Sequence, residues 1–195
     1  MSSSRATTVR TPEYGGHSDP LGDVVFTAHD IEQAVGRIAQ QVRADYAGEP
    51  LFMVGVLKGA VLFAGDLMRA LGDYPLSVDF IVVSSYGTGR GYDSGGNVRL
   101  LKDLDRNPSG QHVLLVEDIV DEGLTLDYLL KNLASRGPRS LRSCTLVDKP
   151  FHRKIDVKVD YIGLSAPDAF LVGYGLDHQE RFRNLPYICK LRTAP

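Results

Sequence analysis

The 195-residue chain contains only two cysteines, Cys144 and Cys189, and they do not form a Cys-x-x-Cys pair. Both lie in apolar segments, which favours buried, reduced thiols in a cytoplasmic protein over a disulfide framework. The five histidines show none of the spacings of zinc ligands, so we expect no zinc site. The sequence therefore argues against a disulfide-rich secreted domain and against a zinc-binding module.

The sequence also lacks a long apolar run and an excess of positive charge. No stretch has the roughly 20 apolar residues that a membrane-spanning helix needs, and the N-terminus lacks the apolar segment of a signal peptide. The formal net charge of -2 and the pI near 6.2 give no sign of non-specific nucleic-acid binding. We therefore expect a cytoplasmic protein with neither a membrane nor a nucleic acid as its partner.

The composition is that of an ordinary globular protein, with 43% hydrophobic and 24% charged residues. Residues 1–20 are rich in Ser, Thr, Gly and Pro and show no periodicity, so we expect a flexible N-terminal tail there. The remaining residues, 21–195, suit one domain with a sizeable core, because no linker or internal repeat divides them.

Apolar runs of strand length alternate with segments of helical periodicity. A helix capped by Thr27 is expected before the first run, and a second helix should end at Gly72. The runs cover residues 51–57, 76–83, 113–116, 141–147 and 158–164. This alternation predicts an α/β fold with a twisted, mostly parallel sheet flanked by helices. Because ligands bind beyond the carboxyl ends of such strands, the ends of the first three runs should face one crevice.

The segment 113–125 carries most of the functional information. Its apolar residues end at two acids, Glu117 and Asp118, and a third acid, Asp121, precedes a glycine turn and a helix. Free N–H groups at a helix N-terminus, with Gly123 permitting close approach, form a site for phosphate. The acids would repel phosphate unless hydroxyl groups or Mg²⁺ intervene. The segment predicts a ligand with phosphate and ribose hydroxyls; the alternative is a plain strand–turn–helix with solvated acids.

This order of two acids, two apolar residues, an acid and a Gly/Thr turn resembles the phosphoribosyl-pyrophosphate signature of type I phosphoribosyltransferases. Further segments extend the resemblance to hypoxanthine-guanine phosphoribosyltransferases over most of the chain after residue 20, namely 56–59, 83–87, 146–150 and 170–177. The Leu-Lys-Asp-Leu-Asp stretch at 101–105 brings the chain closest to the bacterial type. Each segment is weak alone, whereas the combination is specific.

The resemblance implies a type I phosphoribosyltransferase fold with a small hood from terminal segments. It also implies transfer of the 5-phosphoribosyl group from phosphoribosyl pyrophosphate to hypoxanthine or guanine, giving IMP or GMP and pyrophosphate. This is a purine-salvage reaction that requires Mg²⁺, and members of the family are homodimers or homotetramers. The residues do not rank hypoxanthine, guanine and xanthine as substrates.

The resemblance assigns roles on the phosphoribosyl side of the site. Glu117 and Asp118 would hold the ribose hydroxyls, directly or through Mg²⁺, and Asp177 would bind a second Mg²⁺. The 5′-phosphate would lie on the turn and the first helical residues, which are Glu122, Gly123, Leu124 and Thr125.

Four residues match the purine side of the family site. Asp121 would lie near the purine N7, either as a general base or only to orient the base by a hydrogen bond. Lys149 would donate to the exocyclic O6 and select against adenine, which has no acceptor there. Phe170 would stack on the purine ring, and Leu171 would offer backbone groups to its edge.

The leaving pyrophosphate would be held by Lys58, Gly59 and Arg183, and the resemblance implies a cis peptide between Leu57 and Lys58. Ser85 and Tyr86 match a lid loop that closes over the reacting centre. Closure would exclude water from an oxocarbenium-like centre, which water traps easily.

Glu122 departs from the family, in which Thr or Ser usually stands at this position. A carboxylate beside a phosphate dianion is repulsive unless it turns outward or meets a cation. Our hypothesis is that the phosphate cradle still works but binds phosphate less tightly. Two alternatives are a catalytically impaired nucleotide binder and an RNA-binding regulator on the same fold; the matching Asp121, Lys149 and Phe170 favour the enzyme.

Overall fold

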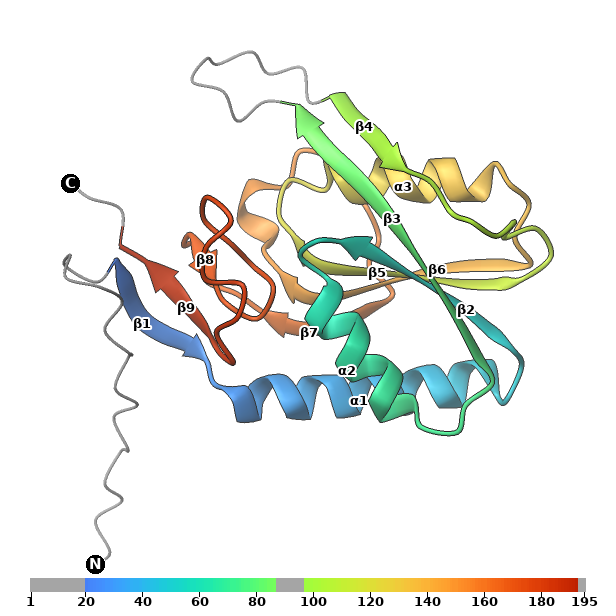
Figure 1. The fold of residues 1–195 in the computed structure, drawn as a ribbon, viewed down its shortest axis with the longest axis horizontal. Helices are drawn as coiled ribbons and strands as arrows, with labels where there is room; N and C mark the ends of the chain where they lie inside the picture. The colour runs from blue at the N-terminus through green and yellow to red at the C-terminus, as the bar shows by residue number, and fades with distance from the viewer. Residues whose placement is uncertain (1–19, 87–96, 193–195) are drawn as a thin grey trace, which may run out of the picture.

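The computed structural model describes residues 20–86 and 97–192, which form two sheets and three α-helices (Figure 1). The larger sheet has six strands in the order β4-β3-β2-β5-β6-β7, all parallel except β4, which is antiparallel to β3. The strands are β2 (Leu51–Leu57), β3 (Leu76–Tyr86), β4 (Asn97–Lys102), β5 (His112–Val120), β6 (Ser140–Asp148) and β7 (Tyr161–Ser165). The predicted mostly parallel α/β sheet is confirmed.

Helices cover both faces of this sheet (Figure 1). Helices α1 (Ala28–Tyr46) and α2 (Val61–Leu71) pack on one face, and α3 (Leu124–Ala134) packs on the other. Side chains alternate between the faces along each strand. Leu114 and Val116 of β5 therefore pack with α1 and α2, whereas Val113 and Leu115 pack with α3. None of the helices in the described residues is long and apolar enough to cross a membrane.

Helix α1 begins where the sequence predicts it. The Asp30 N–H donates to the Thr27 hydroxyl oxygen at 3.2 Å, and the Thr27 N–H donates to the Asp30 carboxylate at 2.8 Å. This reciprocal pair, a capping box, satisfies N–H groups that have no partner within the helix. The helix ends at Tyr46, just before the predicted stop at Gly48 and Pro50.

The smaller sheet joins the two ends of the described chain. Its strands, β1 (Leu21–Phe26), β9 (Ile188–Leu191) and β8 (Leu171–Val172), are antiparallel neighbours in that order. We call this sheet, together with the segment 173–187 between β8 and β9, the hood. It contains the terminal segments that the resemblance assigned to a hood, although no sequence pattern had identified β1.

Several predicted boundaries were wrong. Strand β5 does not stop at Val116: it continues to Val120, because Glu117 and Ile119 pair in register with Thr145 and Val147 of β6. The two acids therefore lie within the strand and not after it. Strand β3 likewise runs past Val83 to Tyr86, paired with β4, and β7 begins three residues later than expected.

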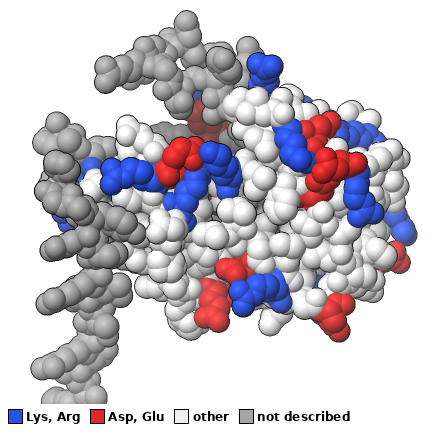
Figure 2. Space-filling model, viewed as in Figure 1, with Lys and Arg blue, Asp and Glu red and all other residues white. Residues whose placement is uncertain are grey.

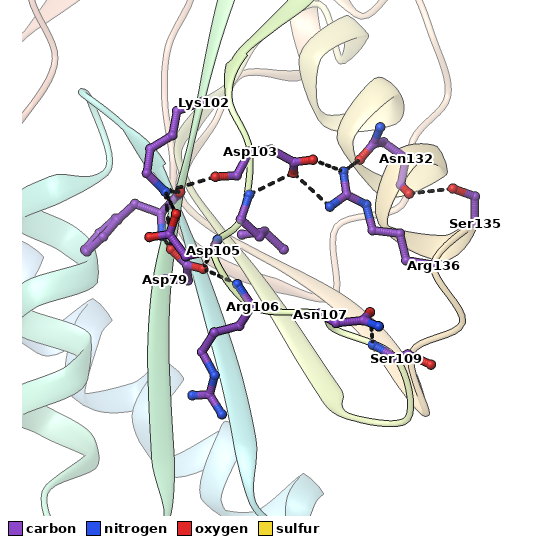
Figure 3. Close-up of polar contacts among 12 residues, drawn as sticks. Asp79, Lys102, Asp103, Asp105, Arg106, Asn107, Ser109, Asn132, Ser135 and Arg136 are labelled. Atoms are coloured by element: carbon purple, nitrogen blue, oxygen red, sulfur yellow. Dashed lines mark hydrogen bonds and ion pairs between the residues drawn. The ribbon is translucent and has the colours of Figure 1, made fainter.

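A polar network at one side of the larger sheet fixes the stretch 101–105 (Figure 3). Lys102 Nζ donates to the carbonyl oxygens of Phe80 at 3.0 Å and Asp103 at 2.9 Å. The same ammonium lies 3.5 Å from Asp79 Oδ1, and the guanidinium of Arg136, which follows α3 and donates to its Asn132, lies 2.8 Å from Asp103. The network thus ties the connection between β4 and β5 to both β3 and α3.

Candidate active site

Strands β2 and β5 are parallel neighbours, so the residues at their carboxyl ends lie side by side. The Leu57–Lys58 peptide that follows β2 is cis, as the resemblance implied. A Cβ added at Gly59 would overlap the Asp118 carboxylate. Only glycine therefore lets the backbone at 58–59 approach the acids of β5, which brings two separately predicted segments into contact.

The two acids of β5 have few partners. Among the described residues, no donor hydrogen-bonds to the Glu117 carboxylate, which is buried. Burial raises the pKa of Glu117 well above its ordinary value, and the neighbouring Asp118 raises it further. Burial also raises the pKa of Asp118 to about 6, although the Ile119 N–H and the Arg183 charge act in the opposite direction. Both acids would gain from a nearby cation or from hydroxyl donors.

The hood brings further predicted residues to the same place. A Cβ at Gly175 would overlap the Gly59 carbonyl oxygen, so the two backbones touch. Arg183 donates to the Gly175 carbonyl at 2.7 Å, and its guanidinium lies 2.8 Å from Asp177 Oδ1. The hood thus brings Asp177 and Arg183 close to Gly59, which lies against Asp118.

Glu180 belongs to this group and was missed by the sequence reasoning. Its carboxylate lies 3.1 Å from Lys58 Nζ and 3.4 Å from Arg183, and its N–H donates to Asp177 at 2.8 Å. The only signal was its place between Asp177 and Arg183, which an ordinary surface acid would share. Glu180 therefore pairs with the two cations predicted to bind pyrophosphate.

On the purine side, the predicted Lys149 and Asp121 form an ion pair with 2.9 Å between Nζ and Oδ2. Asp121 follows β5 and Lys149 follows β6, and the Lys149 N–H donates to the Val120 carbonyl at 2.9 Å. The second carboxylate oxygen of Asp121 is buried and has no hydrogen-bond partner among the described residues. An acceptor oxygen is therefore left for a donor on a ligand.

Phe170 is half exposed and therefore lies outside the core, whereas a Phe beside Leu and Val often packs inside it. Its ring meets the ring of His178 edge to face, with centroids 5.5 Å apart. Nothing in the sequence singled out His178. Leu171, the next residue, is buried in β8, which leaves its backbone as the part able to meet a ligand.

The predicted phosphate cradle is formed by the turn before α3. Gly123 has a φ of 85°, a conformation that favours glycine, and no side chain caps the first turn of the helix. Leu124 and Thr125 open the helix, so their N–H groups have no partner within it. The Glu122 carboxylate lies 2.7 Å from Lys154 Nζ. This acid is therefore paired with a cation, which is one of the two conditions under which it would not repel the phosphate.

The predicted lid loop lies only partly within the described residues. Ser85 and Tyr86 end β3, where their backbones pair with Val98 and Asn97 of β4. Residues 87–96, the glycine-rich continuation of this loop in the sequence, lie outside the described residues.

The predicted Mg²⁺ ligands do not form a closed cage of side chains. Within residues 20–86 and 97–192 there is no group of three or more His, Cys, Asp or Glu side chains placed to hold a metal ion. Asp177 is bound by Arg183, while Glu117 and Asp118 offer oxygen atoms with few donors. This donor set fits a hard cation that takes most of its ligands from water and substrate oxygens, as Mg²⁺ commonly does.

Comparison with known proteins gives a consistent result. A family model described as the phosphoribosyl transferase domain matches residues 23–179. A hypoxanthine-guanine phosphoribosyltransferase of Mycobacterium tuberculosis is 46% identical over 194 residues, which cover 96% of this chain and 94% of that protein.

Solved structures of similar proteins share the fold. A hypoxanthine-guanine phosphoribosyltransferase of Bacillus anthracis has a TM-score of 0.79 and 40% identity, over 88% of this chain and 98% of that one. A hypoxanthine phosphoribosyltransferase mutant of Trypanosoma cruzi, solved as a ternary substrates complex, has a TM-score of 0.82 and 40% identity, over 89% and 96%. The chain therefore belongs to the phosphoribosyltransferase family and, within it, to the hypoxanthine-guanine phosphoribosyltransferases.

Proposed function

We propose that this protein transfers the 5-phosphoribosyl group from phosphoribosyl pyrophosphate to the 6-oxopurines hypoxanthine and guanine. The observation that carries the proposal is the pairing of Lys149 and Asp121 at 2.9 Å, beside the acids of β5. A donor and an acceptor held together in this way match the O6 and N7 edge of a 6-oxopurine.

Lys149 selects the purine in this proposal. Its ammonium donates to the exocyclic O6, and the 6-amino group of adenine has no acceptor for it. Phe170 stacks on the ring from the hood, and the Leu171 backbone meets the purine edge. The half exposure of the Phe170 ring and the burial of Lys149 support this arrangement.

Asp121 faces the purine N7 and accepts a proton or a hydrogen bond from it as N9 attacks C1′ of the ribose. The unpartnered oxygen of Asp121 supports this role. As N9 bonds to C1′, the bond from C1′ to the pyrophosphate oxygen breaks, and the pyrophosphate leaves with the bonding electrons.

The phosphoribosyl group would lie along β5 and the start of α3. The carboxylates of Glu117 and Asp118 accept hydrogen bonds from the ribose hydroxyls, and the N–H groups of 123–125 hold the 5′-phosphate. Mg²⁺, when bound near Glu117, Asp118 and Asp177, would neutralise charge on the pyrophosphate. Lys58, Arg183 and the Gly59 N–H bind the departing pyrophosphate. To do so, Lys58 and Arg183 exchange their contacts with Glu180 for contacts with the pyrophosphate.

Three further proposals accompany this function. Residues 21–195 act as one domain, supported by a hydrophobic cluster that contains both Ile31 of α1 and Ile188 of the hood. The protein is cytoplasmic, supported by two buried cysteines that form no disulfide. It assembles as a homodimer or homotetramer, since soluble enzymes commonly form closed symmetric assemblies.

Pyrophosphate release with each of hypoxanthine, guanine, xanthine and adenine tests the function. We expect release with hypoxanthine or guanine and none with adenine; no release with any base would overturn the proposal. The RNA-binding alternative predicts retention on heparin at physiological salt. Figure 2 argues against it, because positive and negative side chains are interspersed on the face shown, without a broad basic area.

A further inference from the structure

The connection between β6 and β7 supplies three cations that pair with three acids around the purine and phosphate sites. Lys149 pairs with Asp121, and Arg153 pairs with Asp148, the last residue of β6. The third pair joins Lys154 to Glu122, with 2.7 Å between Nζ and Oε1. The first pair has a role in the proposed reaction, whereas the third involves the residue that departs from the family pattern.

The backbone reinforces this third pair. The N–H groups of Lys154 and Ile155 both donate to the Glu122 carbonyl oxygen, at 2.9 and 3.3 Å. Lys154 and Glu122 are therefore joined twice, once through their side chains and once through their backbones. Such a double connection fixes the direction in which the Glu122 side chain leaves the turn.

The same segment lies against the next residue of the cradle. A Cβ at Gly123 would approach the Ile155 carbonyl oxygen and Val157 Cγ1 to 3.0 Å, and Arg153 Cδ to 3.1 Å. The segment 153–157 thus covers one side of the glycine turn. A phosphate that binds the N–H groups of α3 must approach from the other side, so a carboxylate drawn toward Lys154 points away from it.

We propose that Lys154 is a positioning residue for the 5′-phosphate: it holds the Glu122 carboxylate against the segment 153–157 and away from the N–H groups of α3. The proposal rests on the function proposed above, because it takes the cradle as the 5′-phosphate site. Without Lys154, the Glu122 carboxylate would be free to turn toward the phosphate and repel it.

The test compares Lys154→Met with Lys158→Met. Lys158 is a matched control, because it belongs to the same connection, lies outside the segment 153–157 and pairs with Asp160 at 2.7 Å. We expect Lys154→Met to raise the KM for phosphoribosyl pyrophosphate about five- to tenfold with little change in kcat, and Lys158→Met to change neither. Because both side chains of the Lys154 pair are partly exposed, the rise should shrink as salt is added.

A second substitution separates positioning from direct binding. In the double variant Lys154→Met with Glu122→Thr, the KM should return to within about twofold of the wild-type value, and Lys154→Arg alone should retain it. If Glu122→Thr fails to rescue Lys154→Met, Lys154 binds the phosphate itself and the proposal is wrong. An unchanged KM in Lys154→Met would also overturn it.

Calorimetric binding of ribose 5-phosphate gives a readout that needs no turnover. Weaker binding by Lys154→Met, restored by Glu122→Thr, would support the proposal even if no purine were accepted and the proposed reaction failed. If the wild-type protein does not bind ribose 5-phosphate, the cradle assignment is wrong and so is the role of Lys154. Thermal unfolding of each variant separates these outcomes from a loss of folded protein.

Discussion

The larger sheet carries acids at two places, Asp79 in β3 and the pair Glu117 and Asp118 in β5, and their surroundings differ. Asp79 of β3 accepts hydrogen bonds from the N–H groups of Phe80, Asp105 and Arg106 and lies beside Lys102 (Figure 3). Burial alone would raise the pKa of Asp79, but these donors outweigh it and the pKa falls below its ordinary value. Glu117 of β5 exposes a similarly small part of its surface but lies deeper in the protein and has no such donors, so burial raises its pKa.

A small exposed surface therefore does not by itself distinguish a structural acid from a candidate site acid, whereas the supply of hydrogen-bond donors separates these two. Asp79 has its partners within the fold and fixes the connection between β4 and β5. Among the described residues, Glu117 has no donor and Asp118 accepts from the Ile119 N–H, so in the proposed function a cation or hydroxyl groups of the substrate would supply the remaining partners. Substitutions in the two sets should accordingly affect different properties.

The largest effect is expected for Glu117→Gln. Loss of the charge that is proposed to hold ribose and metal should lower kcat/KM at least about 100-fold, the scale of removing one preorganised electrostatic contact in an active site. The thermal midpoint should stay the same or rise, since an unsatisfied buried acid is removed. A large fall in the thermal midpoint together with normal activity would mean that Glu117 serves the fold and not the reaction.

Asp79→Ala should behave in the opposite way. It removes an acceptor from three N–H groups and the partner of Lys102, so unfolding should become easier by about 3 kcal/mol, as measured by urea denaturation. Purified folded protein should keep most of its kcat. Asp105→Ala is the control, because the Asp105 carboxylate is mostly exposed. This substitution should lower the free energy of unfolding by less than about 0.5 kcal/mol.

The pH dependence of Asp118→Asn gives a smaller effect. Since the folded pKa is raised to about 6, the folded state of the ligand-free protein favours the protonated form. Stability from this group is present at low pH and lost as pH rises through 6. The Asn variant should therefore exceed the wild type by about 1–2 kcal/mol at pH 7.5 and match it near pH 4. A gain that is the same at both pH values would contradict this origin.

The smallest effect is expected for Lys102→Met. Its ammonium is about two-fifths exposed, so solvent screens the contact with Asp79, and unfolding should become easier by less than about 1 kcal/mol. The Asp79 carboxylate would keep its three N–H donors. A loss as large as that of Asp79→Ala would mean that the lysine, and not the N–H groups, satisfies this acid.

The sequence allowed the three helices and the five parallel strands of the larger sheet to be predicted in order, because apolar periodicity reports which residues are buried; it gave no sign of β1 or β4. It placed the end of β5 too early, since the strand continues through Glu117, and periodicity cannot detect a strand whose buried residues are acids. The cap at Thr27 was predicted because its partner, Asp30, is only three residues away.

Contacts between distant residues were not predicted from sequence. The resemblance named the principal candidate residues, but the pairing of Glu122 with Lys154, across 32 positions, depends on how the connection between β6 and β7 folds back over the turn. The approach of His178 to Phe170 likewise depends on the hood. Neither partner carries a local signal, because Lys and His are ordinary surface residues.

The hood also bears on the order in which the protein forms during synthesis. Leu21 of β1 pairs with Leu191 of β9, which is 170 positions later in the chain. All six strands of the larger sheet lie before residue 166, so the sheet with Glu117, Asp121 and Lys149 can assemble while β9 is still unmade. On the ribosome, β1 therefore waits for its partner, and the part of the candidate site with Asp177 and Arg183 is synthesised last.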